Sequence, residues 1–470
     1  MTHRRIVIDA STVARWSGPA AGIARVEREY ILWSRRNVPS ATTAFFDPDS
    51  QSYRPFDGTY ELPIVRGEIA VDHRGLSTPT RTRRRFIERV PAGLRPGLLW
   101  VLQFRRELLL ALERRRLRTR NAAFAERIAG IQRTLMTDRY RELMIDPSGK
   151  QRPFLTIKSL LGPPLDLEPD DVLVSVGIGW THTNIETIRR QKAERGFRFV
   201  LLLHDIIPLL FPHFYKPADV DVFRTYLDTA LPLADLVVFT SKCAQSDTQG
   251  YCADRGLAIG RTAVVPLGAD GVRRPAPATK LAGHGLEPGR YILFVSTIEP
   301  RKGHRMILDA WAQLLADGVP QRNGTKLVLV GRPGWLVDDL MTDLARLDPE
   351  TDRVVVRHGI EDDVLALFYS SAAFCVFPSL YEGYGLPVVE AMQYGKPIIA
   401  SNAGPVPELV GGLCPCLDPR DTAAWRDQIR AWIENPPAVA TVADRLKTYR
   451  PMTWDESASR FFAAIDAEVP

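Results

Sequence analysis

Two glutamates on either side of a glycine-rich bend are the residues whose types and spacing most clearly suggest chemistry. Glu382 and Glu390 flank Gly-Tyr-Gly-Leu-Pro in the stretch YEGYGLPVVEAMQYGKP. The apolar run before it, 373–379, predicts a buried strand, and Pro387 suits the first turn of a helix, where its missing N–H leaves no bond unmade. The two glycines of the bend would let the backbone approach a ligand closely. The pattern predicts a strand, loop and helix with a carboxylate on each side of a ligand.

The helix that Pro387 begins would also attract an anion. Unpaired N–H groups in the first turn of a helix bind phosphate. Glu390, in that turn or just beyond it, could accept hydrogen bonds from ribose hydroxyls, while Glu382 would lie nearer whatever the phosphate carries. The spacing could therefore place one carboxylate near each end of a nucleotide sugar. The alternative is that Glu390 only complements the helix dipole and Glu382 is a solvated loop charge; the glycines, the proline and the strand-to-helix context favour the ligand site.

The elements that must position these side chains alternate strand and helix along two stretches of the chain. Continuous apolar strands between helical patterns indicate parallel sheets covered on both faces, an α/β fold. Two such doubly wound domains facing each other would bind a ligand in the cleft between them, at the carboxyl ends of the strands. The predicted strands are 6–12, 171–177, 197–205, 235–241 and 262–268, then 291–297, 326–331, 354–359, 373–379 and 396–402, with helices near 22–36, 183–194, 217–232 and 242–255.

The predicted domain boundaries follow from a Gly- and Pro-rich linker at 268–289. We expect an N-terminal, acceptor-side Rossmann-like domain at 1–272 and a C-terminal nucleotide-sugar-binding domain at 273–450. A last helix in 451–470 would pack back on the N-terminal domain. Thr453 is its expected N-cap, with Glu456 three residues on.

A basic segment at about 75–150 interrupts this alternation and is predicted to be a helical insertion. Residues 81–120 carry thirteen Arg and three Glu, a net charge of +10 in a chain whose total is +6. Because the basic character is local, nucleic acid is not an expected partner. Two interpretations stay open: a solvated helical hairpin, or an element that docks on the anionic inner face of the plasma membrane.

Composition fits an ordinary globular protein, with 45% hydrophobic and 25% charged residues in 470. We expect no signal peptide and no membrane-spanning helix, and the sparse cysteines fit a cytoplasmic location. Cys414 and Cys416 lack a second pair at zinc spacing, and Asp219 and Asp221 fall in a predicted helix, so no metal site is expected. GIGWTH (177–182) is interpreted as a strand-end turn at the cleft wall.

The stretch EGYGLPVVEAMQYGKPIIASNAGPVPELVGG resembles the signature of glycosyltransferase family 4, whose members have the GT-B fold of two facing Rossmann-like domains. FVSTIEPRKGHRMILDAW (294–311) resembles the segment that binds the donor phosphate in that family, and LLLHDIIPLLFP (201–212) and GIARVERE (22–29) resemble motifs of the N-terminal domain. The resemblance covers about 22–36, 170–270 and 290–465, and it does not cover the insertion.

The resemblance implies retaining transfer of a sugar from a nucleotide diphosphate sugar to an acceptor hydroxyl, without a metal or other cofactor. Arg301 and Lys302 would neutralise the leaving diphosphate, because fixed cations stabilise charge that develops as the glycosidic bond breaks. Many members carry an arginine five positions before this lysine, where the sequence has Thr297; Arg301 would supply that charge instead. The Glu-Pro-Arg-Lys variant occurs in a subgroup with many bacterial mannosyltransferases, which favours GDP-mannose as the donor.

Carried over by position, the donor-binding roles continue along the signature. Glu390 would hold the ribose. Glu382 would lie at the donor sugar, with the backbone N–H groups of Gly385 and Leu386 nearby.

Two residues earlier in the chain complete the implied site. His204 would contact the donor sugar near the reacting carbon, and Gly22 would let a loop of the N-terminal domain close over the diphosphate. Retention in this family is usually attributed to attack on the same face, with the leaving phosphate taking the acceptor proton, so no protein nucleophile is named. The residues expected to serve catalysis are Glu382, His204, Arg301 and Lys302.

The function that these inferences favour is a retaining mannosyltransferase that builds a bacterial surface polysaccharide or exopolysaccharide on a lipid-linked saccharide acceptor, in the cytoplasm or on the inner face of the plasma membrane. One alternative is another GT-B enzyme, an epimerase of sugar nucleotides or a phosphorylase. A non-catalytic scaffold at the membrane is the other.

Overall fold

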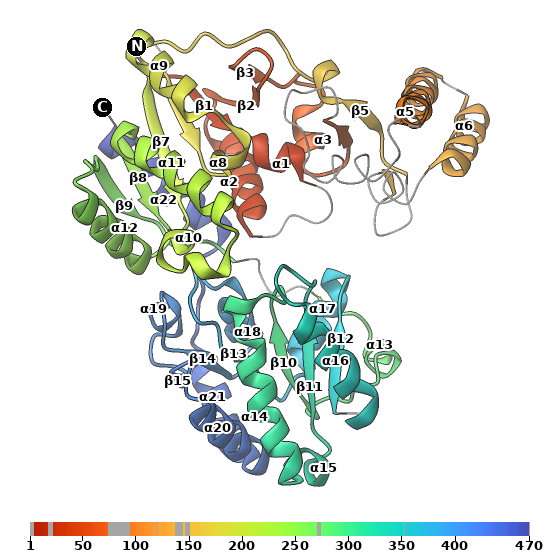
Figure 1. The fold of residues 1–470 in the computed structure, drawn as a ribbon, viewed down its shortest axis with the longest axis vertical. Helices are drawn as coiled ribbons and strands as arrows, with labels where there is room; N and C mark the ends of the chain where they lie inside the picture. The colour runs from red at the N-terminus through yellow and green to blue at the C-terminus, as the bar shows by residue number, and fades with distance from the viewer. Residues whose placement is uncertain are drawn as a thin grey trace. The chain divides into compact units, whose positions relative to one another are not determined.

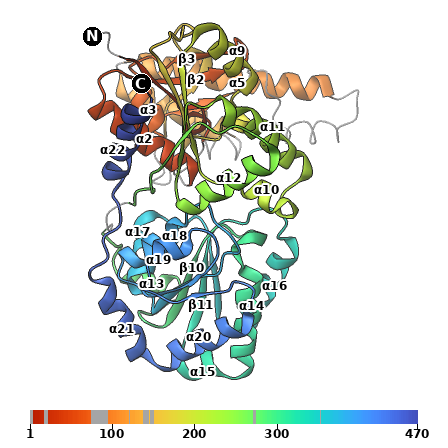
Figure 2. The same ribbon diagram turned by 90° about the vertical axis from the view of Figure 1, so that its left-hand side faces the viewer.

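The computed structural model describes residues 4–16, 22–73, 95–119, 121–136, 144–145, 151–269, 274–351 and 353–469. It has mixed helices and strands, with two large sheets that are mainly parallel (Figures 1 and 2). The chain separates into two compact units. Unit 1 comprises Met1–Leu202, Thr225–Val237 and Ala467–Pro470, and unit 2 comprises Leu203–Arg224 and Val238–Asp466. The domain boundaries expected from the sequence remain predictions.

Within the described ranges, seven strands form the first sheet in the order β3-β2-β1-β6-β7-β8-β9. Strand β1 pairs in parallel with β2 and β6, and β6 with β7, whereas β3 is antiparallel to β2. The residues of β1 and β6 are all buried, as expected for strands covered on both faces. The strands are β1 (Ile6–Asp9), β2 (Ala41–Asp47), β3 (Ser52–Pro55), β6 (Val172–Ser175), β7 (Arg198–Leu203), β8 (Leu236–Phe239) and β9 (Arg261–Val264).

The helices that connect these strands agree with the prediction in most places. One difference lies at the start: the strand predicted for 6–12 ends at Asp9, and a short helix follows because the Asp9 carboxylate accepts the N–H of Ser11 at 2.9 Å. The helices are α1 (Ser11–Arg15), α2 (Ile23–Asn37), α3 (Glu61–Val65), α8 (Gly179–His182), α9 (Ile185–Arg195), α10 (Ile207–Leu210), α11 (Pro217–Leu233) and α12 (Lys242–Arg255), with 3-10 turns η2 (Ile157–Ser159) and η3 (Pro212–Phe214). Asp219 and Asp221 lie in α11, as predicted.

The insertion contains a helical hairpin of α5 (Arg95–Arg118) and α6 (Ala122–Leu135), as Figure 1 shows. Beside it, β4 (Ala70–Asp72) and β5 (Phe154–Thr156) form a small parallel sheet. The arginines at 81–94 lie outside the described residues. Among the helices that the structure describes, none combines the length and the apolar character needed to cross a bilayer.

A buried carboxylate holds the hairpin together. Glu113 is fully buried and forms an ion pair of 2.6 Å with Arg116. It also accepts hydrogen bonds from Gln132 of α6 at 2.9 Å and from the backbone N–H of Phe154 at 3.2 Å. The hairpin is therefore anchored by a polar centre in addition to its apolar contacts.

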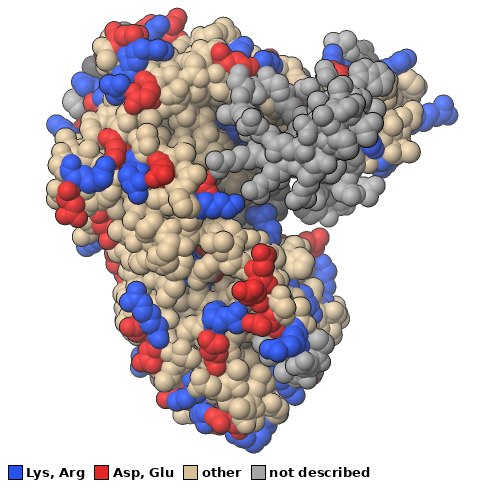
Figure 3. All heavy atoms as spheres, in the orientation of Figure 1, with Lys and Arg blue, Asp and Glu red and all other residues tan. Residues whose placement is uncertain are grey.

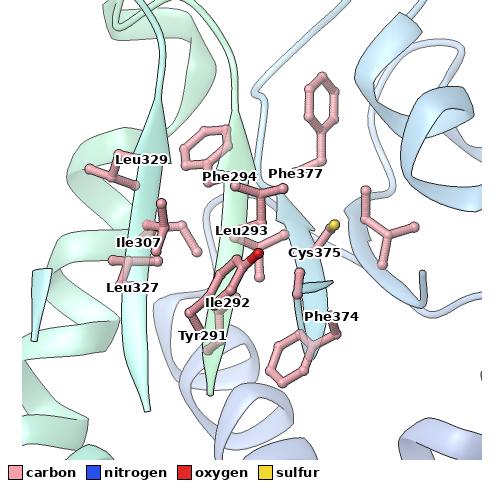
Figure 4. Close-up of a cluster of buried hydrophobic side chains, with 14 of the residues drawn as sticks. Tyr291, Ile292, Leu293, Phe294, Ile307, Leu327, Leu329, Phe374, Cys375 and Phe377 are labelled. Carbon is pink, nitrogen blue, oxygen red and sulfur yellow. The ribbon is translucent and has the colours of Figure 1, made fainter. Parts of the chain in front are cut away.

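In the described part of unit 2, six strands form a parallel sheet in the order β12-β11-β10-β13-β14-β15. Figure 4 shows Ile307 of α14 among apolar side chains of β10, β11 and β13. The bounds are β10 (Tyr291–Val295), β11 (Lys326–Val330), β12 (Val354–Arg357), β13 (Phe374–Phe377), β14 (Ile398–Ser401), β15 (Cys416–Leu417), η4 (Pro300–Lys302), α13 (Thr279–Gly283), α14 (His304–Ala316), α15 (Val319–Asn323), α16 (Asp338–Thr351), α17 (Asp362–Ser371), α18 (Leu386–Gln393), α19 (Val406–Val410), α20 (Thr422–Glu434) and α21 (Pro436–Leu446).

The last helix, α22 (Trp454–Glu468), begins with the predicted capping box. Thr453 Oγ1 accepts the N–H of Glu456 at 3.2 Å, and the Glu456 carboxylate accepts the N–H of Thr453 at 2.8 Å. Ser457 donates to the carbonyl oxygen of Pro266 at 2.7 Å. A Cβ on Gly268 would lie 2.4 Å from the Cα of Trp454, so this glycine permits the close contact.

Candidate functional site

The loop that carries Glu382 leads from β13, a central strand, into α18, as the sequence predicts. Gly385 is the N-cap of α18 and has a φ of 115°, a conformation that glycine adopts without strain. Pro387 follows in the first turn, where its lack of an N–H leaves no bond unmade. Glu382 is buried, with 6% of its surface exposed. A carboxylate is thus held inside the protein at the carboxyl end of the sheet.

Two cations surround the Glu382 carboxylate. Lys302 Nζ lies 2.7 and 2.8 Å from its two oxygens, and Arg301 Nη1 lies 3.0 Å from Oε2. Arg301 also donates to the carbonyl oxygen of Tyr381 and pairs with Glu299 at 2.7 Å. The structure therefore brings together three of the residues that the sequence assigns to the donor site.

The pKa values of the cluster's members are shifted by burial and by their mutual attraction. Burial would raise the pKa of Glu382, but the attraction of Lys302 and Arg301 outweighs it and lowers that pKa to about 2. Burial lowers the pKa of Lys302 despite the opposing attraction of Glu382. For Arg301, burial is outweighed by Glu382 and Glu299, and the pKa is raised. Glu382 is consequently ionised at neutral pH although it is buried.

A glycine explains why Lys302 reaches a carboxylate that follows it by 80 positions in the chain. Gly303 has a φ of 80°, and a Cβ there would lie 2.2 Å from the carbonyl oxygen of Pro378. The N–H of Leu380 donates to the carbonyl oxygen of Arg301 at 2.8 Å. The η4 turn therefore lies against the loop after β13, which places Lys302 beside Glu382.

Glu390 lies in the second turn of α18 and is half-buried. Its Oε2 accepts a hydrogen bond from the hydroxyl of Tyr369, at 3.1 Å. The N–H groups of Gly385 and Leu386 stand at the start of the same helix. Helix α18 thus carries both Glu390, the carboxylate predicted to bind ribose, and the helix N-terminus predicted to bind an anion.

His204 belongs to the same unit and is buried at the end of β7, with 8% of its surface exposed. Thr240 Oγ1 lies 3.1 Å from the carbonyl oxygen of His204 and 3.2 Å from that of Gly383. A Cβ on Gly383 would lie 2.4 Å from Oδ2 of Asp205. The backbone at His204 is therefore a neighbour of the loop that carries Glu382.

Gly22 lies in unit 1, where it is the N-cap of α2 with a φ of 53°. A Cβ at Gly22 would meet no atom within 4 Å, so a larger side chain would not clash with its neighbours there. Its positive φ does favour glycine. Its role at the diphosphate stays a prediction.

The glycines of GIGWTH follow β6, at the predicted strand end. A Cβ on Gly177 would lie 1.8 Å from Oε2 of Glu27, and one on Gly179 would lie 2.4 Å from Oη of Tyr226. Both glycines make room for buried polar side chains of unit 1. That finding explains the motif by packing; contact with an acceptor remains a prediction.

Two residues of this site were missed from the sequence. Glu299 is the acidic partner of Arg301, and its place two positions before that arginine was the available signal. Tyr369 contacts Glu390 from α17, and nothing in the local pattern marks it. Among the described residues, no group of three or more His, Cys, Asp or Glu side chains is arranged to hold a metal ion.

Residues 289–435, which hold the ion cluster and Glu390, match the family model Glycosyl transferases group 1. This segment is therefore similar to the domain of group 1 glycosyltransferases. The resemblance inferred from the signature is confirmed for this part of the chain.

Similar proteins include bacterial mannosyltransferases. O-antigen chain mannosyltransferase B of Escherichia coli is 32% identical over 232 residues, which cover 48% of this chain and 59% of the relative. MMP alpha-(1->4)-mannosyltransferase of Mycolicibacterium hassiacum is 32% identical over 214 residues, 44% of this chain and 48% of the relative. The chain therefore spans about half the length of these curated relatives.

Solved structures show the fold. HepE of Anabaena, in complex with UDP and glucose, is 16% identical to this chain with a TM-score of 0.58, and the match covers 99% of this chain and 100% of HepE. Sucrose-phosphate synthase of Thermosynechococcus elongatus has a TM-score of 0.50 at 23% identity, over 63% of this chain and 73% of its own. The predicted GT-B fold is confirmed, and at these identities the likeness concerns the fold alone.

Proposed function

We propose that this chain is a retaining glycosyltransferase that transfers mannose from GDP-mannose to a saccharide acceptor. The observation that supports it is the buried cluster of Lys302, Arg301 and Glu382 inside the segment that is similar to group 1 glycosyltransferases. Fixed cations in a buried site stabilise a leaving diphosphate strongly, because little water competes with them. The names of the similar mannosyltransferases support the sugar.

On this proposal Lys302 exchanges partners when the donor binds. Its ammonium group lies against both oxygens of Glu382, so a diphosphate at Lys302 competes with that carboxylate. The carboxylate that is displaced becomes available to accept hydrogen bonds from hydroxyls of the donor sugar. Arg301, which also contacts Glu299, retains one acidic partner during the exchange. The exchange couples neutralisation of the diphosphate to recognition of the sugar.

The remaining steps use α18 and the donor itself. The N–H groups of Gly385 and Leu386 bind the diphosphate, and Glu390 accepts hydrogen bonds from the ribose. As the bond from the sugar to phosphate breaks, the departing phosphate oxygen takes the proton of the attacking acceptor hydroxyl. No residue of the chain forms a covalent intermediate, and the cations replace a metal as the source of positive charge.

The acceptor is proposed to be a lipid-linked saccharide of a bacterial surface polysaccharide or exopolysaccharide. The similarity to an O-antigen chain mannosyltransferase supports this class. An O-antigen chain is a polysaccharide, and the enzyme that extends it must accept a growing saccharide.

The experiment that tests the donor is a panel of sugar nucleotides scored by thermal shift, followed by measurement of sugar transfer and of nucleoside diphosphate release. We expect GDP-mannose to raise the melting temperature most. Lys302→Ala should weaken GDP binding about 10- to 100-fold, the range for a lost hydrogen bond to a charged group. Unchanged GDP affinity would remove Lys302 from the diphosphate site.

A matched control variant is Lys396→Ala. Lys396 lies in the same domain and donates to the carbonyl oxygen of Ala372 at 3.1 Å. It should leave GDP affinity near that of the parent protein. A non-catalytic scaffold would release no nucleoside diphosphate from any sugar nucleotide, and a phosphorylase would require orthophosphate; either result would overturn the proposed transfer.

We also propose that the α5–α6 hairpin docks on the anionic inner face of the plasma membrane. Phe104, Leu117, Phe124 and Ile131 are large apolar side chains that remain exposed on it. The guanidinium of Arg115 lies 5.4 Å from the centre of the Phe124 ring. Figure 3 shows basic side chains at the outer edge of the hairpin, whose basic residues are all arginines. Apolar and basic side chains together suit an interface of acyl chains and anionic headgroups.

The docking test reverses the charge of Arg114 and Arg115, both exposed. Arg116 is left unchanged because its pair with the buried Glu113 holds the hairpin together. Arg114→Glu with Arg115→Glu should abolish sedimentation with vesicles rich in phosphatidylglycerol. Arg346→Glu with Lys447→Glu, two exposed cations in unit 2, is the control and should sediment like the parent. Equal sedimentation of both double variants would rule out docking through the hairpin.

A further inference from the structure

The carboxylate of Glu390 is held by a tyrosine from another helix. Tyr369 of α17 is buried, with 2% of its surface exposed, and its hydroxyl donates to Glu390 Oε2 at 3.1 Å. Glu390 itself is only half-buried. The hydroxyl therefore approaches the carboxylate from inside the domain, and one of the two carboxylate oxygens already has a fixed donor.

A second tyrosine holds Tyr369 in place. The rings of Tyr369 and Tyr394 are parallel within 5°, with their centres 5.3 Å apart. Tyr394 is the residue at which α18 ends, and its N–H donates to the carbonyl oxygen of Glu390 at 3.1 Å. The two rings and the carboxylate thus form one packed group that joins α17 to α18.

Such a group limits the movement of a side chain that is otherwise flexible. A glutamate loses rotamer freedom when it is immobilised, and a binding site that fixes it beforehand avoids that loss on binding. Burial and the nearby charge of Glu390 both raise the pKa of the Tyr369 phenol. Tyr369 therefore keeps its proton and stays a donor throughout the neutral range.

We infer that Tyr369 is a positioning residue for nucleotide recognition: its hydroxyl orients Glu390 so that the carboxylate accepts hydrogen bonds from the ribose of a nucleoside diphosphate. The inference rests on the proposed function, in which Glu390 binds ribose. On this inference Tyr369 makes the protein prefer ribose to deoxyribose, although it does not itself contact the ligand. The consequence is measurable as a preference between two nucleotides that differ only at the ribose hydroxyls.

The test compares the affinity of Tyr369→Phe and of the parent for GDP and for 2′,3′-dideoxy-GDP, by calorimetry. Tyr369→Phe removes one oxygen and keeps the ring stack. We expect the ratio of GDP affinity to dideoxy-GDP affinity to fall about 3- to 10-fold, the range for one hydrogen bond. Affinity for dideoxy-GDP itself should stay near that of the parent.

The matched control is Tyr291→Phe. Tyr291 is also fully buried, and its hydroxyl donates to a backbone carbonyl, that of Phe368, at 2.6 Å. The variant loses a buried hydrogen bond of the same kind. Its acceptor, Phe368, directly precedes Tyr369 in the sequence, and the bond does not involve the Glu390 carboxylate. It should keep the parent ratio. A general loss of stability would move both variants alike, whereas the positioning role moves only Tyr369→Phe.

A second variant keeps the inference testable if Tyr369→Phe does not fold. Tyr394→Leu retains the hydroxyl of Tyr369 but removes the stacked ring, and should lower the same ratio by a smaller factor. An unchanged ratio in the folded variants, with a parent that prefers GDP, would overturn the positioning role alone. A parent that binds neither GDP nor UDP would overturn the proposed function, and this inference with it.

Discussion

Two buried carboxyl groups in different parts of the molecule have pKa values shifted in opposite directions. Glu382 in unit 2 is 6% exposed and contacts Lys302 and Arg301, which hold its pKa at about 2. Glu27 in unit 1 is fully buried, and its described partners are the N–H of Val13 and groups of Thr12. Burial, with the charge of the nearby Asp9, raises the pKa of Glu27 well above its usual value.

The difference shows that burial alone does not decide the role of an acid. Burial favours the protonated form of Glu27, which joins α2 to the first turn of α1, so this acid serves the fold. Glu382 is charged only because two cations compensate it, and those cations could equally compensate another anion. A buried ion cluster at the end of a central strand is therefore a stronger indication of a ligand site than a buried acid.

The largest expected effect separates the two acids by substitution. Glu382→Gln leaves Lys302 and Arg301 buried without their shared carboxylate and should lower the free energy of unfolding by about 3 kcal/mol. Burial raises the pKa of Glu27 and favours the protonated acid, which glutamine resembles, so Glu27→Gln should lower that free energy by about 1 kcal/mol or less. Urea denaturation at pH 7 measures both. Equal losses would mean that the two acids are in the same charge state.

The pH dependence of stability should have opposite sign for the two acids. Glu382 has a lowered pKa in the folded chain, so its contribution, about 3 kcal/mol for a pKa near 2, is present above the unfolded value of about 4.3 and is lost as pH falls towards 2. Glu27 has a raised pKa, so its contribution is present below about 4.3 and is lost as pH rises.

The measurement is the free energy of unfolding as a function of pH for the parent and for both glutamine variants. Glu382→Gln should flatten the loss of stability between about pH 5 and pH 2. Glu27→Gln should reduce the loss of stability that the parent shows as pH rises above about 4.3. If a variant leaves the pH dependence of the free energy of unfolding unchanged in the range expected for its acid, the direction of the pKa shift assigned to that acid is refuted.

A further expected effect concerns the glycine beside Glu27. A Cβ on Gly177 would lie 1.8 Å from Oε2 of Glu27, so Gly177→Ala should destabilise unit 1 by about 1 to 3 kcal/mol through overpacking. Gly130→Ala in α6 is the control, because a Cβ there meets no atom within 4 Å and alanine favours a helix. Thermal unfolding that ranks the two variants the other way would contradict the packing role of Gly177.

The sequence predicted those features whose signals are local. The apolar run before Glu382, the glycines and Pro387 predicted β13, the loop and α18, and Thr453 with Glu456 predicted the capping box. Each of these signals acts within a few residues, through backbone conformation or a hydrogen bond between near neighbours.

Features that depend on contacts between distant segments were missed. The sequence assigned Glu382 to the sugar and Lys302 to the phosphate, but it could not reveal that the two side chains pair with each other. Glu27 falls in an amphipathic helix, where a charged residue is expected to face water, and its burial depends on space left by Gly177. Such pairings depend on which distant segments the fold brings together at the ends of the strands, and the local sequence does not indicate them.

The turn at Gly303 has a consequence for protein engineering. Because that glycine lets the chain of η4 lie against the carbonyl oxygen of Pro378, Lys302 reaches a carboxylate supplied by a separate segment. A chimaera that received only the signature 381–397 would gain the acid without its counter-ions. Exchange of donor preference between enzymes of this kind should therefore move the segment from β10 to α18 as one block, with Gly303 retained.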